Sequence, residues 1–238
     1  QGGMVVALTP LSPLATNGGY TVSVSGVRDL VGNVIAAPVS SSFATIDTII
    51  PAISALTIPA GSDFIQGNSI LITPQTADTD IAFVDFFVEN ILVKSVSSAP
   101  FTMVYTLPTA GTVHLKAIAQ DKVGNRGLPA FLDLNVAVDQ PPTVTFTSPA
   151  DGSRVNTGST FSVILQGTDD LSLKEITLTL SGEMNTSQTK TVTGKNASAT
   201  FTFTAPTGVT GSGAITLTAT AKDSANNTAA QIARTITV

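Results

Sequence analysis

The chain has 238 residues and a formal net charge of -5, and only 11% of its residues are charged, against roughly 25% in ordinary globular chains. The acidic balance leaves no basic stripe for phosphate groups, which excludes nucleic acid as a partner. There is no cysteine, which excludes disulfides and thiolate metal sites, and no apolar run approaches the ~18 to 20 residues of a membrane span. Thr and Ser replace the missing charges, a composition that suits strands better than helices and predicts an all-β fold.

One short motif occurs three times, each time after an alternating apolar segment. Its fourth residue is Gly, Gly and then Asn, the residues that most readily adopt positive φ, and its first residue is Asp, whose side chain accepts backbone hydrogen bonds two residues on. The motif is therefore predicted to be a turn between two strands. The copies are Asp29–Asn33, Asp121–Asn125 and Asp223–Asn227.

The first 45 residues hold too few predicted strands for a closed unit. Strands are expected at Met4–Leu8, Tyr20–Ser25 and Val34–Thr45, on either side of the first turn. Since the chain starts at Gln1 without an initiator methionine, we expect it to be a piece of a longer polypeptide whose upstream part completes this unit.

A family resemblance becomes specific in the same region. Leu8-Thr9-Pro10, Tyr20-Thr21-Val22-Ser23-Val24 and Ser42-Phe43-Ala44-Thr45 resemble the C-terminal half of bacterial Ig-like domains of the kind found in S-layer and large surface proteins. The two later units resemble the bacterial Ig-like repeats of adhesins and carbohydrate-active exoproteins. The resemblance implies a fold and a type of joint rather than an activity.

Two acidic joints with proline divide the chain. Asp47 and Asp139 each precede a proline within four residues, and they lie 92 residues apart, the same spacing as Asp29 and Asp121. Two landmarks with one period indicate a tandem array. The predicted domains are the C-terminal part of an Ig-like domain at 1–46 and complete Ig-like sandwiches at 47–138 and 139–238.

The middle unit is predicted to contain seven strands, as an Ig-like sandwich requires. They are expected near 52–58, 69–75, 82–88, 91–97, 101–107, 112–120 and 130–138. The last unit repeats the pattern, and the acidic stretch after its second strand, Gln166–Asp170, matches Gln75–Asp80. The predicted fold class is all-β, with tandem immunoglobulin-like β-sandwiches in a linear array.

The sequence contains few residues that could form a catalytic site or a carbohydrate-binding site. The one histidine, His114, is expected to face solvent on a strand, and no serine stands in a nucleophile-elbow context, so the protein is predicted not to be an enzyme. The chain has no Trp and only two tyrosines, Tyr20 and Tyr105, both expected in the core. A carbohydrate-binding face built on exposed aromatic rings is therefore disfavoured.

Eight aspartates are the candidate metal ligands. In an Ig-like unit, the entering segment, the loop after the second strand and the turn after the sixth strand lie at one pole, so four carboxylates are expected to converge in each complete unit. Calcium accepts six to eight oxygen ligands and suits such a loop cluster. The alternative is that each aspartate only caps its own turn. The candidates are Asp47, Asp78, Asp80 and Asp121 in one unit and Asp139, Asp169, Asp170 and Asp223 in the next.

These features predict a non-enzymatic spacer or adhesin segment of a bacterial surface or secreted protein, a rod stiffened by calcium at its joints. Its partners are expected to be neighbouring Ig-like domains of the same longer chain, other protein subunits or cell-surface glycans, and its location extracellular. Two alternatives stay open: an accessory or carbohydrate-binding module of an exoenzyme, and a filament subunit completed by β-strand addition.

Overall fold

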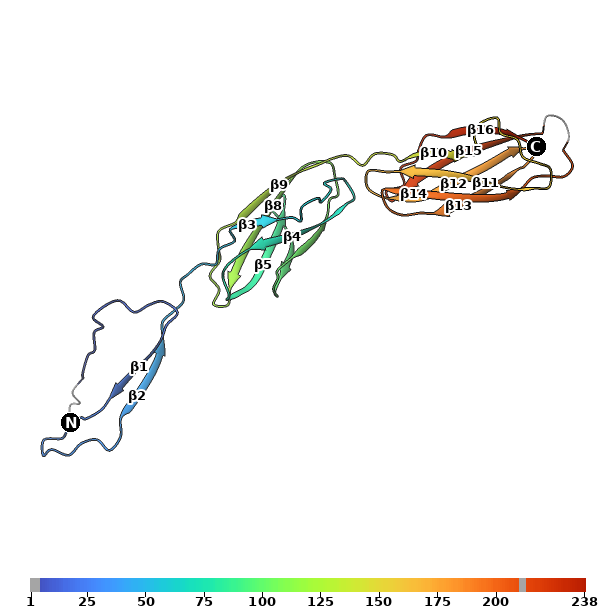
Figure 1. Cartoon of the computed structure of the whole chain (residues 1–238). Helices are drawn as coiled ribbons and strands as arrows, with labels where there is room; N and C mark the ends of the chain where they lie inside the picture. Colours follow the sequence, from blue (N-terminus) through green and yellow to red (C-terminus); the bar gives the residue numbers. More distant parts are fainter. Residues whose placement is uncertain (1–4, 210–212) are drawn as a thin grey trace. The chain divides into compact units, whose positions relative to one another are not determined.

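The computed structural model describes residues 5–209 and 213–238, and within them the regular elements are all β-strands (Figure 1). No helix in this part of the chain is long and apolar enough to cross a membrane. The strands of the described residues are, in chain order, β1 (Gly19–Val24), β2 (Val39–Ala44), β3 (Ala55–Thr57), β4 (Ser69–Gln75), β5 (Ile81–Val88), β6 (Ile91–Val96), β7 (Met103–Thr106), β8 (Gly111–Asp121), β9 (Ala130–Val136), β10 (Thr143–Ser148), β11 (Thr160–Thr168), β12 (Leu173–Gly182), β13 (Thr186–Thr191), β14 (Asn196–Thr204), β15 (Ala214–Asp223) and β16 (Ile232–Thr237).

The same sheet arrangement occurs twice. Strands β3, β4 and β7 make a three-stranded sheet and β6, β5, β8 and β9 a four-stranded one. Strands β10, β11 and β14, and then β13, β12, β15 and β16, repeat this arrangement. A three-plus-four pair of sheets is the immunoglobulin-type sandwich. The predicted all-β fold of tandem immunoglobulin-like sandwiches is confirmed.

By its contacts the chain divides into two compact units. One contains Gln1–Thr57, Thr73–Met103 and His114–Leu132, and the other contains Ile58–Ile72, Val104–Val113 and Asp133–Val238. Each sheet takes its strands from within one of the predicted domains 1–46, 47–138 and 139–238. The domain boundaries themselves stay a prediction.

The inward rows of two long strands position the candidate site. In β8, alternate residues from Val113 to Asp121 are buried, and in β15 the buried row runs from Ile215 to Asp223. The apolar members fill the cores; in the C-terminal sandwich they join a cluster that includes Phe201, which is fully buried. Because a strand directs every second side chain to the same face, each buried row ends in an aspartate at the margin of the core.

The segment before the first sandwich has no core of its own. Strands β1 and β2 pair as a two-stranded antiparallel sheet, and none of the residues described between 5 and 46 is buried. The predicted strand at Met4–Leu8 is wrong in its described part, since residues 5–8 form no strand, and Met4 lies outside the described residues. The predicted strand Val34–Thr45 shortens to β2, because Val34 makes only an isolated bridge to Arg28.

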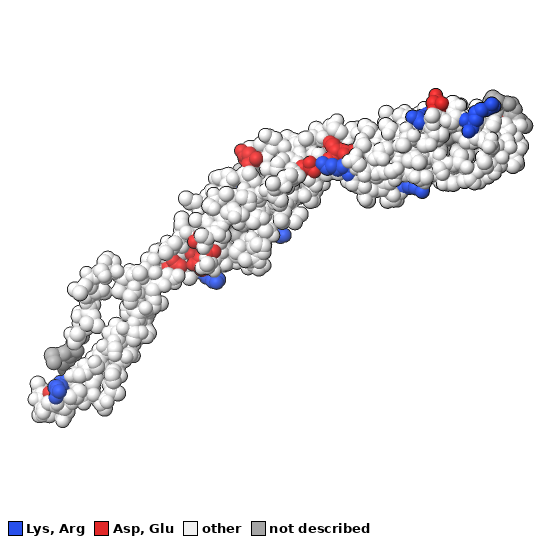
Figure 2. Space-filling model, in the orientation of Figure 1, with Lys and Arg blue, Asp and Glu red and all other residues white. Residues whose placement is uncertain are grey.

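Hydroxyl pairs take the place of charges on exposed strand faces. Thr177 and Thr189 share a hydrogen bond of 2.8 Å across β12 and β13, and Thr179 and Ser187 repeat it at 2.9 Å. In the view of Figure 2 most of the surface is neither acidic nor basic, and acidic side chains gather in a few small patches. The low charge content of the sequence thus reappears as uncharged cross-strand ladders.

Candidate metal centre

The three repeated motifs form the predicted turns. The fourth residue has positive φ in every copy: +97° at Gly32, +103° at Gly124 and +72° at Asn226. In the second copy, Asp121 Oδ1 accepts hydrogen bonds from three successive backbone N–H groups, those of residues 123, 124 and 125, at 3.0, 2.8 and 2.8 Å. The aspartate therefore organises the turn, as its position in the motif predicts.

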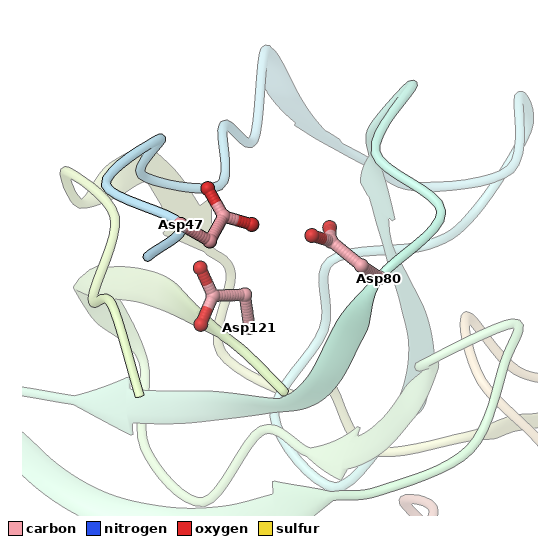
Figure 3. A group of neighbouring side chains, drawn as sticks. All are labelled: Asp47, Asp80 and Asp121. Carbon is pink, nitrogen blue, oxygen red and sulfur yellow. The ribbon is translucent and has the colours of Figure 1, made fainter. Parts of the chain in front are cut away.

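The first acidic group joins three elements of one unit. Asp47 lies in the segment before β3, Asp80 directly precedes β5, and Asp121 ends β8. Figure 3 shows the three side chains pointing toward a common space, and a carboxylate oxygen of each lies within 4.8 Å of one from each of the others. Asp47 and Asp121 are buried and Asp80 is half-buried. Of the four carboxylates predicted to converge in this unit, the structure brings these three together.

Two of the three carboxylates of this first group accept hydrogen bonds from nearby N–H groups. Asp47 Oδ1 accepts a hydrogen bond from the Ile49 N–H at 2.9 Å, and Asp121 Oδ2 accepts one from the Asn125 side-chain amide at 2.8 Å. Burial acts to raise the pKa of Asp121, but the hydrogen bonds from Asn125, Val123 and Gly124 outweigh it and leave that pKa below its ordinary value. The buried anion is thus stabilised by the chain itself.

The second acidic group lies in the other unit, and its carboxylates have fewer hydrogen-bond donors. Carboxylate oxygens of Asp139, Asp169 and Asp170 lie within 4.8 Å of one another. One oxygen of each accepts a single hydrogen bond: Asp139 from Asn227 Nδ2 at 3.0 Å, Asp169 from a backbone N–H at 2.9 Å and Asp170 from another at 3.3 Å. The other oxygen of each, Oδ1 in all three, is buried and has no hydrogen-bond partner.

Asp223 adds a fourth carboxylate beside this group. Its side chain is 0% exposed, its Oδ1 accepts a hydrogen bond from the Asn227 N–H at 2.8 Å, and its Oδ2 has no partner. Burial raises the pKa of Asp139 to about 6, with further contributions from the negative charges of Asp223, Asp170 and Asp169 in that order. Four carboxylates therefore interact here without enough donors to stabilise their charges.

The two groups are not copies of one another. In strand register Ile81 pairs with Asp121, and Leu173 pairs with Asp223. Ile81 and Leu173 are therefore equivalent positions, and so are the residues just before them, Asp80 and Ser172. The counterpart of Asp80 is thus a serine and not an aspartate. The first group has a carboxylate at this position, that of Asp80. In the second group the loop contributes Asp169 and Asp170 instead, which come before Ser172.

Asp78, the counterpart of Asp170 in this register, does not belong to the group of three. Its Oδ2 accepts a hydrogen bond from the Ala52 N–H at 2.6 Å, so the carboxylate fastens the segment that enters the sandwich. The similar composition of Gln75–Asp80 and Gln166–Asp170 predicts four equivalent carboxylates in each unit. The structure brings three together in the first unit and three plus the neighbouring Asp223 in the second.

A proline explains why Asp139 lacks the partner that Asp47 has. Asp47 binds the N–H two residues on, at Ile49, whereas the residue two after Asp139 is Pro141, which has no N–H. The Asn of each turn differs as well: Asn125 donates its amide to the aspartate of its own turn, and Asn227 donates to Asp139 instead. The missing N–H of Pro141 is therefore the signal in the sequence from which the different surroundings of Asp139 can be predicted.

Other predicted positions are partly confirmed. His114 is exposed on β8, as expected. Among the phenylalanines, Phe43 and Phe131 are 47% and 68% exposed, whereas five are buried: Phe86, Phe146, Phe161, Phe201 and Phe203. Tyr20 and Tyr105 are half-buried rather than fully enclosed.

The chain is similar to one family of bacterial domains and to several solved structures. Residues 142–219 match the family described as a bacterial Ig domain. Fibronectin(III)-like modules of CbhA from Clostridium thermocellum are 21% identical with a TM-score of 0.33, covering 77% of this chain and 93% of that one. The chitinase ChiA74 from Bacillus thuringiensis is 15% identical with a TM-score of 0.33, covering 81% of this chain and 30% of that one. At these identities and TM-scores, the two similarities say nothing about the function of this chain.

No curated protein matches the sequence. The family match covers β10 to β14 entirely and reaches into β15, and it includes the loop between β11 and β12 that contains Asp169 and Asp170. Residues 142–219 therefore match a bacterial Ig domain, in agreement with the resemblance predicted from the sequence.

Proposed function

We propose that this chain is a non-enzymatic structural segment of a bacterial extracellular protein, a spacer that holds other domains of the same polypeptide at a distance. The observation that carries the proposal is a fastening repeated at the start of both sandwiches. Asn125 Nδ2 donates to the backbone carbonyl of Asp47 at 3.1 Å, and Asn227 Nδ2 donates to the carboxylate of Asp139 at 3.0 Å. In both places the entering segment is bound to the turn of the sandwich that it enters.

Such fastening suits a spacer. A segment that is hydrogen-bonded to the following sandwich has lost the freedom of a flexible coil, and prolines in the same segments restrict it further. The part of each joint that can move freely is therefore shorter. The match of residues 142–219 to a bacterial Ig domain supports an extracellular location, where arrays of such domains commonly occur.

Small-angle scattering of the whole chain tests the proposal. A single compact domain of this length would have a radius of gyration of about 18 Å. An extended array with units of about 35 to 40 Å should give a clearly larger value and a maximum dimension of about 100 to 120 Å. A radius near 18 Å would contradict the spacer. Specific binding of the same sample on a glycan array would favour an accessory carbohydrate-binding module instead.

A further inference from the structure

The described part of the chain contains four buried side-chain oxygen atoms without a hydrogen-bond partner, and all four belong to one cluster. They are Asp139 Oδ1, Asp169 Oδ1, Asp170 Oδ1 and Asp223 Oδ2. Asp223 is 0% exposed and Asp139 is 9% exposed, so water has little access to either carboxylate. Buried carboxylates are normally paired or hydrogen-bonded on both oxygens, because leaving one unsatisfied carries a large free-energy cost.

We propose that Asp139, Asp169, Asp170 and Asp223 form a calcium-binding site, and that the corresponding group Asp47, Asp80 and Asp121 does not bind calcium with comparable strength. This inference goes beyond the spacer function and does not depend on it. The unpartnered oxygens are the decisive observation, since a bound cation supplies the partner that buried carboxylate oxygens lack.

The donor set fits a hard cation of calcium's size. All candidate ligands are carboxylate oxygens, and those of Asp139, Asp169 and Asp170 lie within 4.8 Å of one another. Calcium binds oxygen at about 2.3 to 2.6 Å, so two ligands on opposite sides of the ion are about 4.6 to 5.2 Å apart. Magnesium binds at about 2.0 to 2.1 Å and requires near-ideal octahedral geometry, a stricter demand on carboxylates that come from three separate segments of the chain.

No positive side chain takes the cation's place. Within residues 5–209 and 213–238, the ion pairs of lysine and arginine engage other carboxylates, such as the pair of Lys222 and Glu175 at 3.3 Å. The nearby Lys174 donates to the side chain of Asn226 at 2.6 Å and not to an aspartate of the cluster. The charge of the four carboxylates is therefore not neutralised by the chain.

The first acidic group differs in the feature that matters. None of its carboxylate oxygens is both buried and unpartnered among the described residues. The Ile49 N–H supplies Asp47, and the Asn125 amide together with three backbone N–H groups supplies Asp121. A cation at that group would compete with hydrogen bonds that already stabilise the anions.

Calorimetric titration of the whole chain with calcium chloride tests the proposal, with magnesium chloride as the comparison. We expect one calcium ion per chain with a dissociation constant of about 1 mM or lower, the range of extracellular modules. Asp139→Asn and Asp170→Asn should each abolish binding. Asp80→Asn, the matched control in the other group, should leave both stoichiometry and affinity unchanged. Thermal melting of every variant in chelator verifies that each one folds.

The outcomes separate cleanly. Loss of binding in Asp139→Asn and Asp170→Asn with retention in Asp80→Asn supports the assignment. No calcium binding by the unmodified chain overturns the site, and two equivalent ions per chain overturn the proposed difference between the groups. Loss of binding only in Asp80→Asn places the ion in the wrong group and also overturns the proposal. A failed titration would leave the scattering test of the spacer untouched, since scattering measures the dimensions of the chain and not its metal content.

Discussion

Asn227 donates its side-chain amide to Asp139, 88 residues earlier in the chain, at 3.0 Å. The equivalent amide in the preceding sandwich, that of Asn125, donates to the carboxylate of Asp121 within its own turn at 2.8 Å. The redirected amide leaves Asp223 Oδ2 without a partner. The second turn therefore lacks the amide bond that Asn125 gives to Asp121, and a buried anion is left unsatisfied.

Replacing Pro141 should reduce the dependence on calcium. Pro141→Ile, which introduces the residue found at position 49, supplies an N–H two residues after Asp139, as Ile49 does for Asp47 at 2.9 Å. The new donor should stabilise the Asp139 carboxylate, so the difference in melting temperature between calcium and chelator should shrink. Pro142→Ile is the control, since it loses a comparable proline restraint without placing an N–H at that position. An equal change in both variants would contradict the explanation.

Removing the Asn125 side chain should destabilise the first sandwich. Its amide donates to Asp121 Oδ2 and to the Asp47 carbonyl, and Asp121 is only 1% exposed. Asn125→Ala leaves a buried carboxylate with one oxygen unsatisfied, at a cost of about 1 to 3 kcal/mol. Urea unfolding measures the loss. Asn33→Ala, which removes the corresponding amide from the exposed carboxylate of Asp29, should have a much smaller effect.

The stability of the chelated protein should fall as the pH rises through about 6. Burial raises the pKa of Asp139 to about 6, so the folded state holds this proton more tightly than the unfolded state, where an aspartate has a pKa of about 3.9. Its favourable contribution is complete below about pH 4 and is lost as the pH rises through 6. Asp121 has a lowered pKa and acts in the opposite direction, but only at lower pH. Melting temperatures between about pH 4.5 and 7.5 should therefore decline in the unmodified chain and stay flatter in Asp139→Asn.

Residues 139–238 should fold as an isolated fragment. The core cluster of this region draws all its buried members from positions 144 to 236, and Phe201, Leu178 and Leu217 are each fully enclosed within it. A single cooperative urea transition is the expected result. Leu178→Ala in that fragment should lower the free energy of unfolding by about 2 to 5 kcal/mol. A broad, non-cooperative transition would show that the core needs residues outside the fragment.

Much of this architecture could be predicted because strand periodicity and turn chemistry are local. The strand predicted at 69–75 is β4, and that at 112–120 is β8 within one residue at each end. The Asp-to-Asn turns were predictable because positive φ restricts the fourth residue to Gly or Asn. The acidic groups were predictable only in outline. Which oxygen receives which N–H depends on register, and the register made Ser172 the counterpart of Asp80.

The threonine and serine ladders also determine how the fold responds to its medium. Ion pairs weaken as dissolved salt screens them, with a Debye length of only about 3 Å at 1 M ionic strength. The bonds between Thr177 and Thr189 and between Thr179 and Ser187 join neutral hydroxyl groups, which salt does not screen. We therefore expect the stability of these sandwiches to depend less on salinity than that of a surface held together by ion pairs.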